Sequence, residues 1–186
     1  PVPSRRFGRS IGVSPIPHKA CSYSCVYCQL GKTTDMRADR HRFFNLEDIE
    51  NDISSTVTAC NGNTDYITIV GDGEPTLSSD IGRLISYCKS HWNIPVAVIT
   101  NGSLLSDAML RKELSRADVV SVTVSAGEEE IFRKIHRPHG KLKFRGVMDG
   151  METFRKEFPG KFWAEVMLVA GLNDSREKLL GIKEKL

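Results

Sequence analysis

A regular alternation of apolar strands with amphipathic helices is the feature that most restricts how this chain can fold. Four segments rich in β-branched residues are predicted strands, and helical periodicity fills the stretches between them. These strand segments are residues 65–70, 95–100, 118–125 and 161–169. Because a helix follows each strand, the strands are expected to run parallel in a sheet that helices cover. The sequence therefore predicts an α/β fold.

The starts of the helices carry capping residues, which helps to place them. The residues predicted to begin four of the helices are Asn45, Ser78 or Ser79, Ser106 and Ser175. Helical pattern also covers residues 128–136 and returns around residues 147–158. A short apolar run at residues 11–13 is a fifth and weaker strand candidate.

Side chains alternate between the two faces of a strand, which separates an apolar face from a polar one. In the strand predicted at residues 118–125 the apolar set is Val120, Val122 and Val124, and the polar set is Ser121, Thr123 and Ser125. In the last strand Ala164, Val166 and Leu168 oppose Glu165 and Met167, and we assign Thr68 and Thr100 to the polar face as well. We expect the apolar face to meet the helices and the polar face to line a cavity. An inward Glu165 needs a partner, either a structural ion pair or a cofactor or substrate.

Three cysteines, Cys21, Cys25 and Cys28, fall within eight residues. A cubane Fe–S cluster offers four irons to thiolates, so three ligands leave one iron open to a small molecule. A structural zinc site usually has four protein ligands, and a ferredoxin-type cluster also has a fourth cysteine. A disulfide scaffold is the third alternative, and no other feature of the sequence indicates one. The spacing therefore favours an open [4Fe–4S] cluster. Cys60 and Cys88 lie on apolar helix stripes and are expected in the core.

The cysteine motif resembles the signature of the radical S-adenosylmethionine (SAM) superfamily, including the aromatic Tyr27 before the last cysteine. Residues 71–75, Gly-Asp-Gly-Glu-Pro, resemble the GGEP segment of that superfamily, with Asp72 in place of the second glycine. The resemblance implies a partial (β/α)6 barrel made by a single domain over residues 1–186. It also implies a sixth strand and a C-terminal part that we expect to lie outside this sequence.

The same resemblance implies the cofactors and their ligands. The metal ligands would be Cys21, Cys25 and Cys28, whose cluster binds SAM at its open iron and receives an electron from a flavodoxin- or ferredoxin-like donor. Reductive cleavage of SAM would give a 5′-deoxyadenosyl radical that acts on an unknown substrate. The residues expected to contact SAM are Tyr27 on the adenine side, the backbone of Gly71, Asp72, Gly73 and Glu74 at the ammonium, and Asn101 with Ser125 or Thr123 at the ribose or carboxylate.

One of these contacts departs from the family pattern. Relatives usually have aspartate where Ser125 stands, which weakens the contact carried over to that residue. A backbone hydrogen bond is the alternative role for the hydroxyls of Ser125 and Thr123. The sequence names no residue that performs the hydrogen abstraction itself.

Residues 3–9, 28–31 and 134–138 resemble a subgroup related to the wyosine tRNA-modifying synthases. Those synthases hold a second cluster near the N-terminus, and this chain has no cysteines for one, which argues against a tRNA substrate. Basic residues gather at positions 5–9, 32–42 and 133–145, where they form either a rim for RNA or solvated surface charge. We favour surface charge.

The 186 residues, 40% hydrophobic and 26% charged with a net charge of +3, fit one globular domain. No apolar run reaches about 18 residues, the length of a membrane span, and the start lacks a signal peptide. We therefore expect a cytoplasmic protein, in which thiolates stay reduced. The absence of an initiator Met suggests processing or trimming.

Three functions remain open at this point. The first is a radical SAM enzyme with an unknown substrate, and activation of a partner enzyme belongs to this case. The second is a tRNA-modifying enzyme of the same class. The third is a non-catalytic Fe–S or zinc protein for electron transfer or structure. Residues 71–75 favour an enzyme over the third function, because an electron carrier has no need of a segment that binds SAM.

Overall fold

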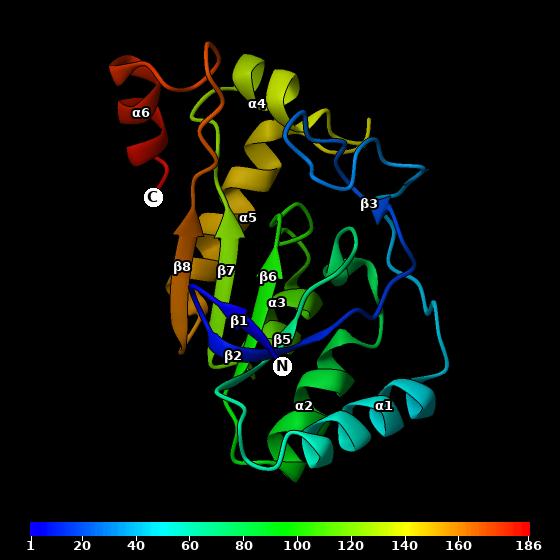
Figure 1. The fold of residues 1–186 in the computed structure, drawn as a ribbon. Coiled ribbons are helices and arrows are strands. Elements are labelled where there is room, and N and C mark those ends of the chain that lie inside the picture. Colours follow the sequence, from blue (N-terminus) through cyan, green and yellow to red (C-terminus); the bar gives the residue numbers. More distant parts are fainter.

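A computed structural model describes all 186 residues and contains a sheet of six strands in the order β1-β2-β5-β6-β7-β8 (Figure 1). The strands are β1 (Val2–Ser4), β2 (Gly8–Val13), β5 (Tyr66–Ile69), β6 (Val96–Thr100), β7 (Val119–Thr123) and β8 (Lys161–Glu165). All neighbours from β2 to β8 pair in parallel. The predicted parallel sheet of five strands is therefore confirmed. The antiparallel hairpin that β1 makes with β2 is an addition that the sequence did not indicate.

Six helices and three short elements complete the chain. The helices are α1 (Leu46–Ala59), α2 (Ile81–His91), α3 (Ala108–Leu114), α4 (Glu129–His136), α5 (Phe144–Glu157) and α6 (Arg176–Lys183). A second sheet pairs β3 (Ala20–Cys21) with β4 (Asp35–Met36), and a 3-10 turn, η1 (Pro75–Leu77), precedes α2. None of the helices is long and apolar enough to cross a membrane.

Two of the predicted helix starts are confirmed and two are wrong. Asn45 caps α1 and Ser175 caps α6, each with its side chain bonded to a backbone N–H of the first turn. The cap of α3 is Asp107 rather than Ser106, because the Asp107 carboxylate accepts the first free amides of that helix. The N-cap position of α2 is Asp80 rather than a serine, because η1 takes up the residues before it.

The helix-facing side of the sheet is the apolar core. Ile69, Val98 and Val120 lie side by side in register across three strands and are fully buried. Val122 and Val124 belong to the same cluster, which confirms the predicted apolar face of the strand at residues 118–125. Thr100 was assigned wrongly to the opposite face, since its register partner is Val122. In the core Cys88 is fully buried and Cys60 packs against the cluster from its edge, as expected.

Strand β8 is shorter than predicted and ends at Glu165 rather than at residue 169. It is the last strand of the sheet, with a neighbour on one side only. Ala164 is exposed, and Leu168 beyond the strand end is 56% exposed. Register places Ala164 opposite Val122, on the helix-facing side as predicted, but its side chain is exposed because an edge strand receives less cover from the helices. Leu168 lies beyond the strand, so the predicted face does not extend to it.

The inner face of the sheet is packed at the N-terminal ends of the strands and polar toward their C-terminal ends. Phe7, from the turn of the β1–β2 hairpin, stacks on Trp163 of β8 with ring centroids 5.2 Å apart. The hairpin crosses in front of the β7 and β8 arrows in Figure 1. Arg6 forms an ion pair with Glu165, so of the two roles left open for that carboxylate the structure shows the ion pair. The predicted cavity on the polar face is thus confined to the C-terminal ends.

Candidate cofactor site

The cysteine loop (residues 21–28) lies against the C-terminal end of α4. The backbone N–H of Ser24 donates to the carbonyl of His136, and that of Val26 donates to the carbonyl of Ile135, both at 2.9 Å. The last carbonyls of a helix have no partner within the helix, so α4 offers fixed acceptors to an irregular segment. Two elements more than 100 residues apart in the sequence are joined in this way.

The three cysteines line one cavity of about 340 Å³ at the C-terminal ends of the strands. Cys21, Cys25 and Cys28 are free thiols and are half-buried. Tyr27, Gly71, Gly73, Glu74, Asn101 and Thr123 line the same cavity. No group of three His, Cys, Asp or Glu side chains in the chain converges on the position of a single metal ion. The lining residues show that the three predicted ligands and most of the predicted SAM contacts surround the same cavity.

The GDGEP loop (residues 71–75) follows β5 and packs directly on the start of the cysteine loop. The Glu74 N–H donates to the Ala20 carbonyl at 3.0 Å, and the Lys19 N–H donates to the Asp72 carbonyl at 2.7 Å. A Cβ on Gly73 would overlap the Ala20 carbonyl oxygen. Glycine is therefore required at position 73 for the two loops to approach each other at all.

Glu74 is a buried carboxylate that ties the GDGEP loop to the end of β6. One of its oxygens accepts from the N–H and hydroxyl of Thr76, at 3.0 and 2.5 Å, and from the Thr100 hydroxyl at 2.5 Å. The other accepts from the Asn101 N–H at 2.7 Å. Burial raises the pKa of Glu74, and these hydrogen bonds act in the opposite direction. The sequence analysis assigned Glu74 only a backbone contact and missed this role of its side chain.

Asn101 reaches the cysteine loop from the end of β6. Its amide donates to the Ser22 hydroxyl at 2.9 Å and lies 3.8 Å from the Cys21 sulfur. Ser125, by contrast, is fully buried, and its hydroxyl accepts from the Met167 N–H at 3.0 Å. That contact is the backbone hydrogen bond named as the alternative for this residue. The structure thus places Asn101 in the cavity wall and engages Ser125 elsewhere.

Burial sets the protonation behaviour of the groups around the thiols. It raises the pKa of Cys21 to about 12 and that of Cys25 to about 11. His136 has its Nδ1 3.3 Å from the Cys25 sulfur, and burial lowers the pKa of its imidazole to about 4. Burial also raises the pKa of Tyr27. A metal centre bound here would supply the positive charge that buried thiolates need.

Lys19 and Tyr23 also line the cavity, and neither was predicted from the sequence. Both are buried hydrogen-bond donors that lack some of the acceptors they could use. Lys19 is 3% exposed; its ammonium lies 3.5 Å from the Cys28 sulfur and donates to the Gly31 carbonyl. Tyr23 is 2% exposed, and its hydroxyl has no hydrogen-bond partner. Unpaired buried donors are costly, so the cavity suits an anionic or acceptor-rich ligand. A [4Fe–4S] cluster on three thiolates carries net negative charge and fits that requirement.

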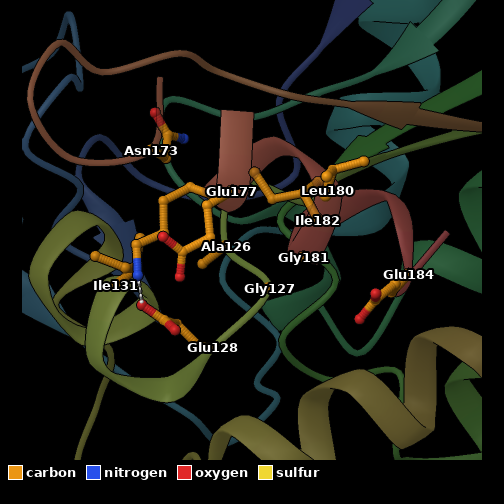
Figure 2. A pocket seen from close by; sticks show the side chains of 11 residues that line it. Ala126, Gly127, Glu128, Ile131, Asn173, Glu177, Leu180, Gly181, Ile182 and Glu184 are labelled. Atoms are coloured by element: carbon orange, nitrogen blue, oxygen red, sulfur yellow. Dashed lines mark hydrogen bonds and ion pairs between the residues drawn. The ribbon is translucent and has the colours of Figure 1, made fainter. Parts of the chain in front are cut away.

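A second cavity of about 360 Å³ lies between the start of α4 and α6 (Figure 2). Glu128 and Lys178 form an ion pair across it, and Gly127 lies directly against the backbone of Gly181. No cysteine lines this cavity. It therefore holds none of the predicted metal ligands.

The basic segments are largely neutralised by nearby carboxylates. The ion pairs are Arg9–Asp65, Arg37–Asp35, Arg40–Glu113, Arg42–Asp80, Arg133–Glu129, Lys134–Glu130, Lys141–Asp39 and Arg145–Asp149. Alternating charges of this kind are typical of solvated protein surface. They supply no continuous basic rim, in agreement with the favoured interpretation of the sequence.

Comparison with known proteins identifies the family. A family model described as "Radical SAM superfamily" matches residues 16–181 of this chain. A UPF0026 protein of Methanocaldococcus jannaschii is 37% identical over 100% of this chain and 58% of its own length. A protein named GTPase Obg from Brachyspira hyodysenteriae is 40% identical over 96% of this chain but only 26% of its own length. The chain thus spans a quarter to just over half of these relatives.

Solved structures show the same fold. A structure named native anSMEcpe with bound AdoMet has a TM-score of 0.72 and 21% identity, covering 95% of this chain and 48% of that one. A structure of TYW1 with a lysine–pyruvate adduct bound has a TM-score of 0.66 and 16% identity, covering 95% of this chain and 61% of that one. The first of these neighbours was solved with AdoMet bound. The match over residues 16–181 and the shared fold establish that this chain belongs to the radical SAM superfamily.

Proposed function

We propose that this chain is the cofactor-binding core of an enzyme that holds a [4Fe–4S] cluster and cleaves SAM reductively to act on a substrate not yet known. The observation that carries the proposal is the cavity in which three free thiols meet the GDGEP loop. Membership of the superfamily supports the class of chemistry. The buried donors of Lys19 and Tyr23 support an anionic occupant.

In this proposal Cys21, Cys25 and Cys28 each donate a thiolate to the cluster. The cluster and SAM supply the one-electron chemistry when they are bound, and an external one-electron donor is required. The half-buried position of the thiols limits their access to water. The anchoring of the cysteine loop on α4 holds their spacing before any cofactor arrives.

The wall opposite the thiols is proposed to receive SAM. Gly71, Gly73 and Glu74 line the cavity, and their backbone is proposed to meet the SAM ammonium, while Tyr27 offers an aromatic surface to the adenine. Asp72 is not part of this lining, and its carbonyl accepts from the Lys19 N–H instead. Asn101 is proposed to contact SAM from the cavity wall, where the Ser22 hydroxyl and the Ser103 N–H orient its amide. Ser125 is proposed to hold the end of β7 in place through its bond to the Met167 amide. Glu74 keeps the GDGEP loop and β6 in register for these contacts.

The two alternative functions receive less support. Most charges of the basic segments are paired with carboxylates, which weakens the electrostatic attraction that tRNA binding draws on. A pure electron carrier or structural zinc protein has no use for the glycine-dependent approach of Gly73 to the cysteine loop. The cavity beside the thiols is also larger than a closed metal site requires.

The decisive experiment compares the wild-type protein with Cys25→Ser after anaerobic reconstitution with iron and sulfide. Iron and sulfide contents are measured first, followed by electron paramagnetic resonance of the reduced protein with and without SAM, and by assay of 5′-deoxyadenosine. The wild type is expected to bind about four irons, to change its resonance signal on addition of SAM and to form 5′-deoxyadenosine. Cys60→Ser is the matched control, because Cys60 lies outside the cavity.

The outcomes separate the alternatives. Loss of iron in Cys25→Ser but not in Cys60→Ser supports the assignment of the ligands. A wild-type resonance signal that SAM does not change, or zinc bound in place of iron, would overturn the proposed chemistry. Retention of tRNA at near-physiological salt would instead favour the tRNA-modifying alternative.

A further inference from the structure

Lys19 stands apart from the other basic residues of this chain. It is the only lysine or arginine among the buried residues, and no carboxylate lies within ion-pair distance of its ammonium. Its two side-chain contacts are the Cys28 sulfur, at 3.5 Å, and the Gly31 carbonyl. A buried charge normally has an opposite charge beside it. We therefore expect the group that binds to the cysteine loop to supply the negative charge opposite Lys19.

The backbone of Lys19 is held in a conformation that aims this side chain. Its φ of 63° lies in the left-handed region, which a residue with a Cβ adopts only at a cost in free energy. The N–H of Lys19 donates to the Asp72 carbonyl at 2.7 Å, so the GDGEP loop fixes the conformation. Strained residues persist where the surrounding structure determines them, and such places are often functional.

The charge of the cluster explains what the ammonium does. An oxidised [4Fe–4S] centre on three thiolates carries net negative charge, and a one-electron reduction adds to it. A positive charge in contact with one of these thiolates attracts the reduced form more strongly than the oxidised form. Hydrogen bonds to the sulfurs act in the same direction and are among the features that set cluster potentials.

We propose that Lys19 tunes the cluster: its ammonium hydrogen-bonds to the Cys28 thiolate and raises the reduction potential of the [4Fe–4S] centre. This inference rests on the proposed function. Lys19 is a positioning residue that acts through Cys28 and does not itself contact the substrate. The step it favours is the transfer of one electron from an external donor, which is oxidised by one electron, to the cluster, with no proton transferred.

The test is a redox titration of the reconstituted protein, followed by the resonance signal of the reduced cluster. Dithionite or titanium(III) citrate serves as the one-electron reductant, with mediators to fix the potential. In Lys19→Met the ratio of reduced to oxidised cluster at a fixed potential is expected to fall about tenfold, equivalent to about 59 mV for one electron. Lys19→Arg keeps the charge and is expected to restore most of the ratio. Lys32→Met removes an equal charge from an exposed position of the same region and is expected to leave the ratio unchanged.

A second variant without the charge, Lys19→Gly, separates a loss of charge from a defect in folding or cluster assembly. Lys19→Gly removes the charge and also relieves the left-handed backbone, so it is expected to lower the ratio as Lys19→Met does. Iron content and circular dichroism accompany each titration. Equal potentials in the wild type, Lys19→Met and Lys19→Gly, with full iron content, would overturn the role of Lys19 and leave the proposed function standing. A wild-type protein that binds no cluster would overturn both.

Discussion

Replacing Glu74 by glutamine tests whether its carboxylate holds the cofactor end of the sheet together. Glutamine keeps the shape of the side chain and one acceptor oxygen, which can still take the bonds from Thr76 and Thr100. The other oxygen becomes an NH₂ group that faces the Asn101 N–H, so two donors meet where a 2.7 Å hydrogen bond existed. The substitution therefore removes one bond to a charged acceptor and leaves a backbone amide unsatisfied.

The magnitude follows from those two losses. A hydrogen bond to a charged group contributes about 1.5–3 kcal/mol, and a buried donor without a partner costs about 1–3 kcal/mol. Relief from burying a charge, which is also what raises the pKa of Glu74, offsets part of this loss. We expect a net loss of about 3 kcal/mol in the free energy of unfolding. For a chain of this size that lowers Tm by about 6–12 °C.

The assay is urea unfolding of the protein without cofactors, followed by circular dichroism. Glu184→Gln is the matched control, because Glu184 is exposed and forms no ion pair, and its stability is expected within about 0.5 kcal/mol of the wild type. If Glu74→Gln also falls within about 0.5 kcal/mol of the wild type, the hydrogen bond from the Asn101 N–H to the carboxylate contributes nothing net. The account of how residues 71–75 are joined to β6 would then be refuted.

Other substitutions test the packing on either side of this site. Gly73→Ala places a Cβ on the Ala20 carbonyl, so it is expected to lower the free energy of unfolding by more than about 2 kcal/mol in urea, or to force the two loops apart. A loss below about 0.5 kcal/mol would contradict the close approach of the two loops. Gly146→Ala, exposed in α5 with open space for the methyl group, is expected to stabilise by about 0.5–1 kcal/mol, and a destabilised protein would count against the helix assignment. Phe7→Ala is expected to cost about 3–5 kcal/mol and to shift the fluorescence of Trp163, since it removes the stacked ring; an unchanged spectrum would argue against the stack.

Much of the fold was predictable because runs of β-branched residues mark buried parallel strands. The strands around Ile67, Val98 and Val120 were found in this way, and their order along the chain is also their order in the sheet. The β1–β2 hairpin was missed because Val2–Ser4 is too short and proline-rich to show a pattern. Thr100 was misplaced because the sequence analysis used its polarity instead of its register.

The candidate site was predictable only as far as its motifs extend. The cysteines, the residues of the GDGEP loop and Asn101 each carry a local signal, and the structure gathers them around one cavity. Lys19 carries no such signal, because its burial depends on loops that meet only in three dimensions. The side-chain role of Glu74 was missed for the same reason, since its partners come from the next strand.

The stack of Phe7 on Trp163 and the ion pair of Arg6 with Glu165 have a consequence for the order of folding. The strands from β5 to β8 add to the sheet in chain order, so each docks on a neighbour that already exists. The contact between Arg6 and Glu165 instead joins residues 159 positions apart, and closing so long a loop is entropically costly and slow. The hairpin is therefore expected to seal the inner face last, after β8 has formed. The first residues of the chain and its last strand are then joined in one late step, through the Arg6–Glu165 ion pair and the stack of Phe7 on Trp163.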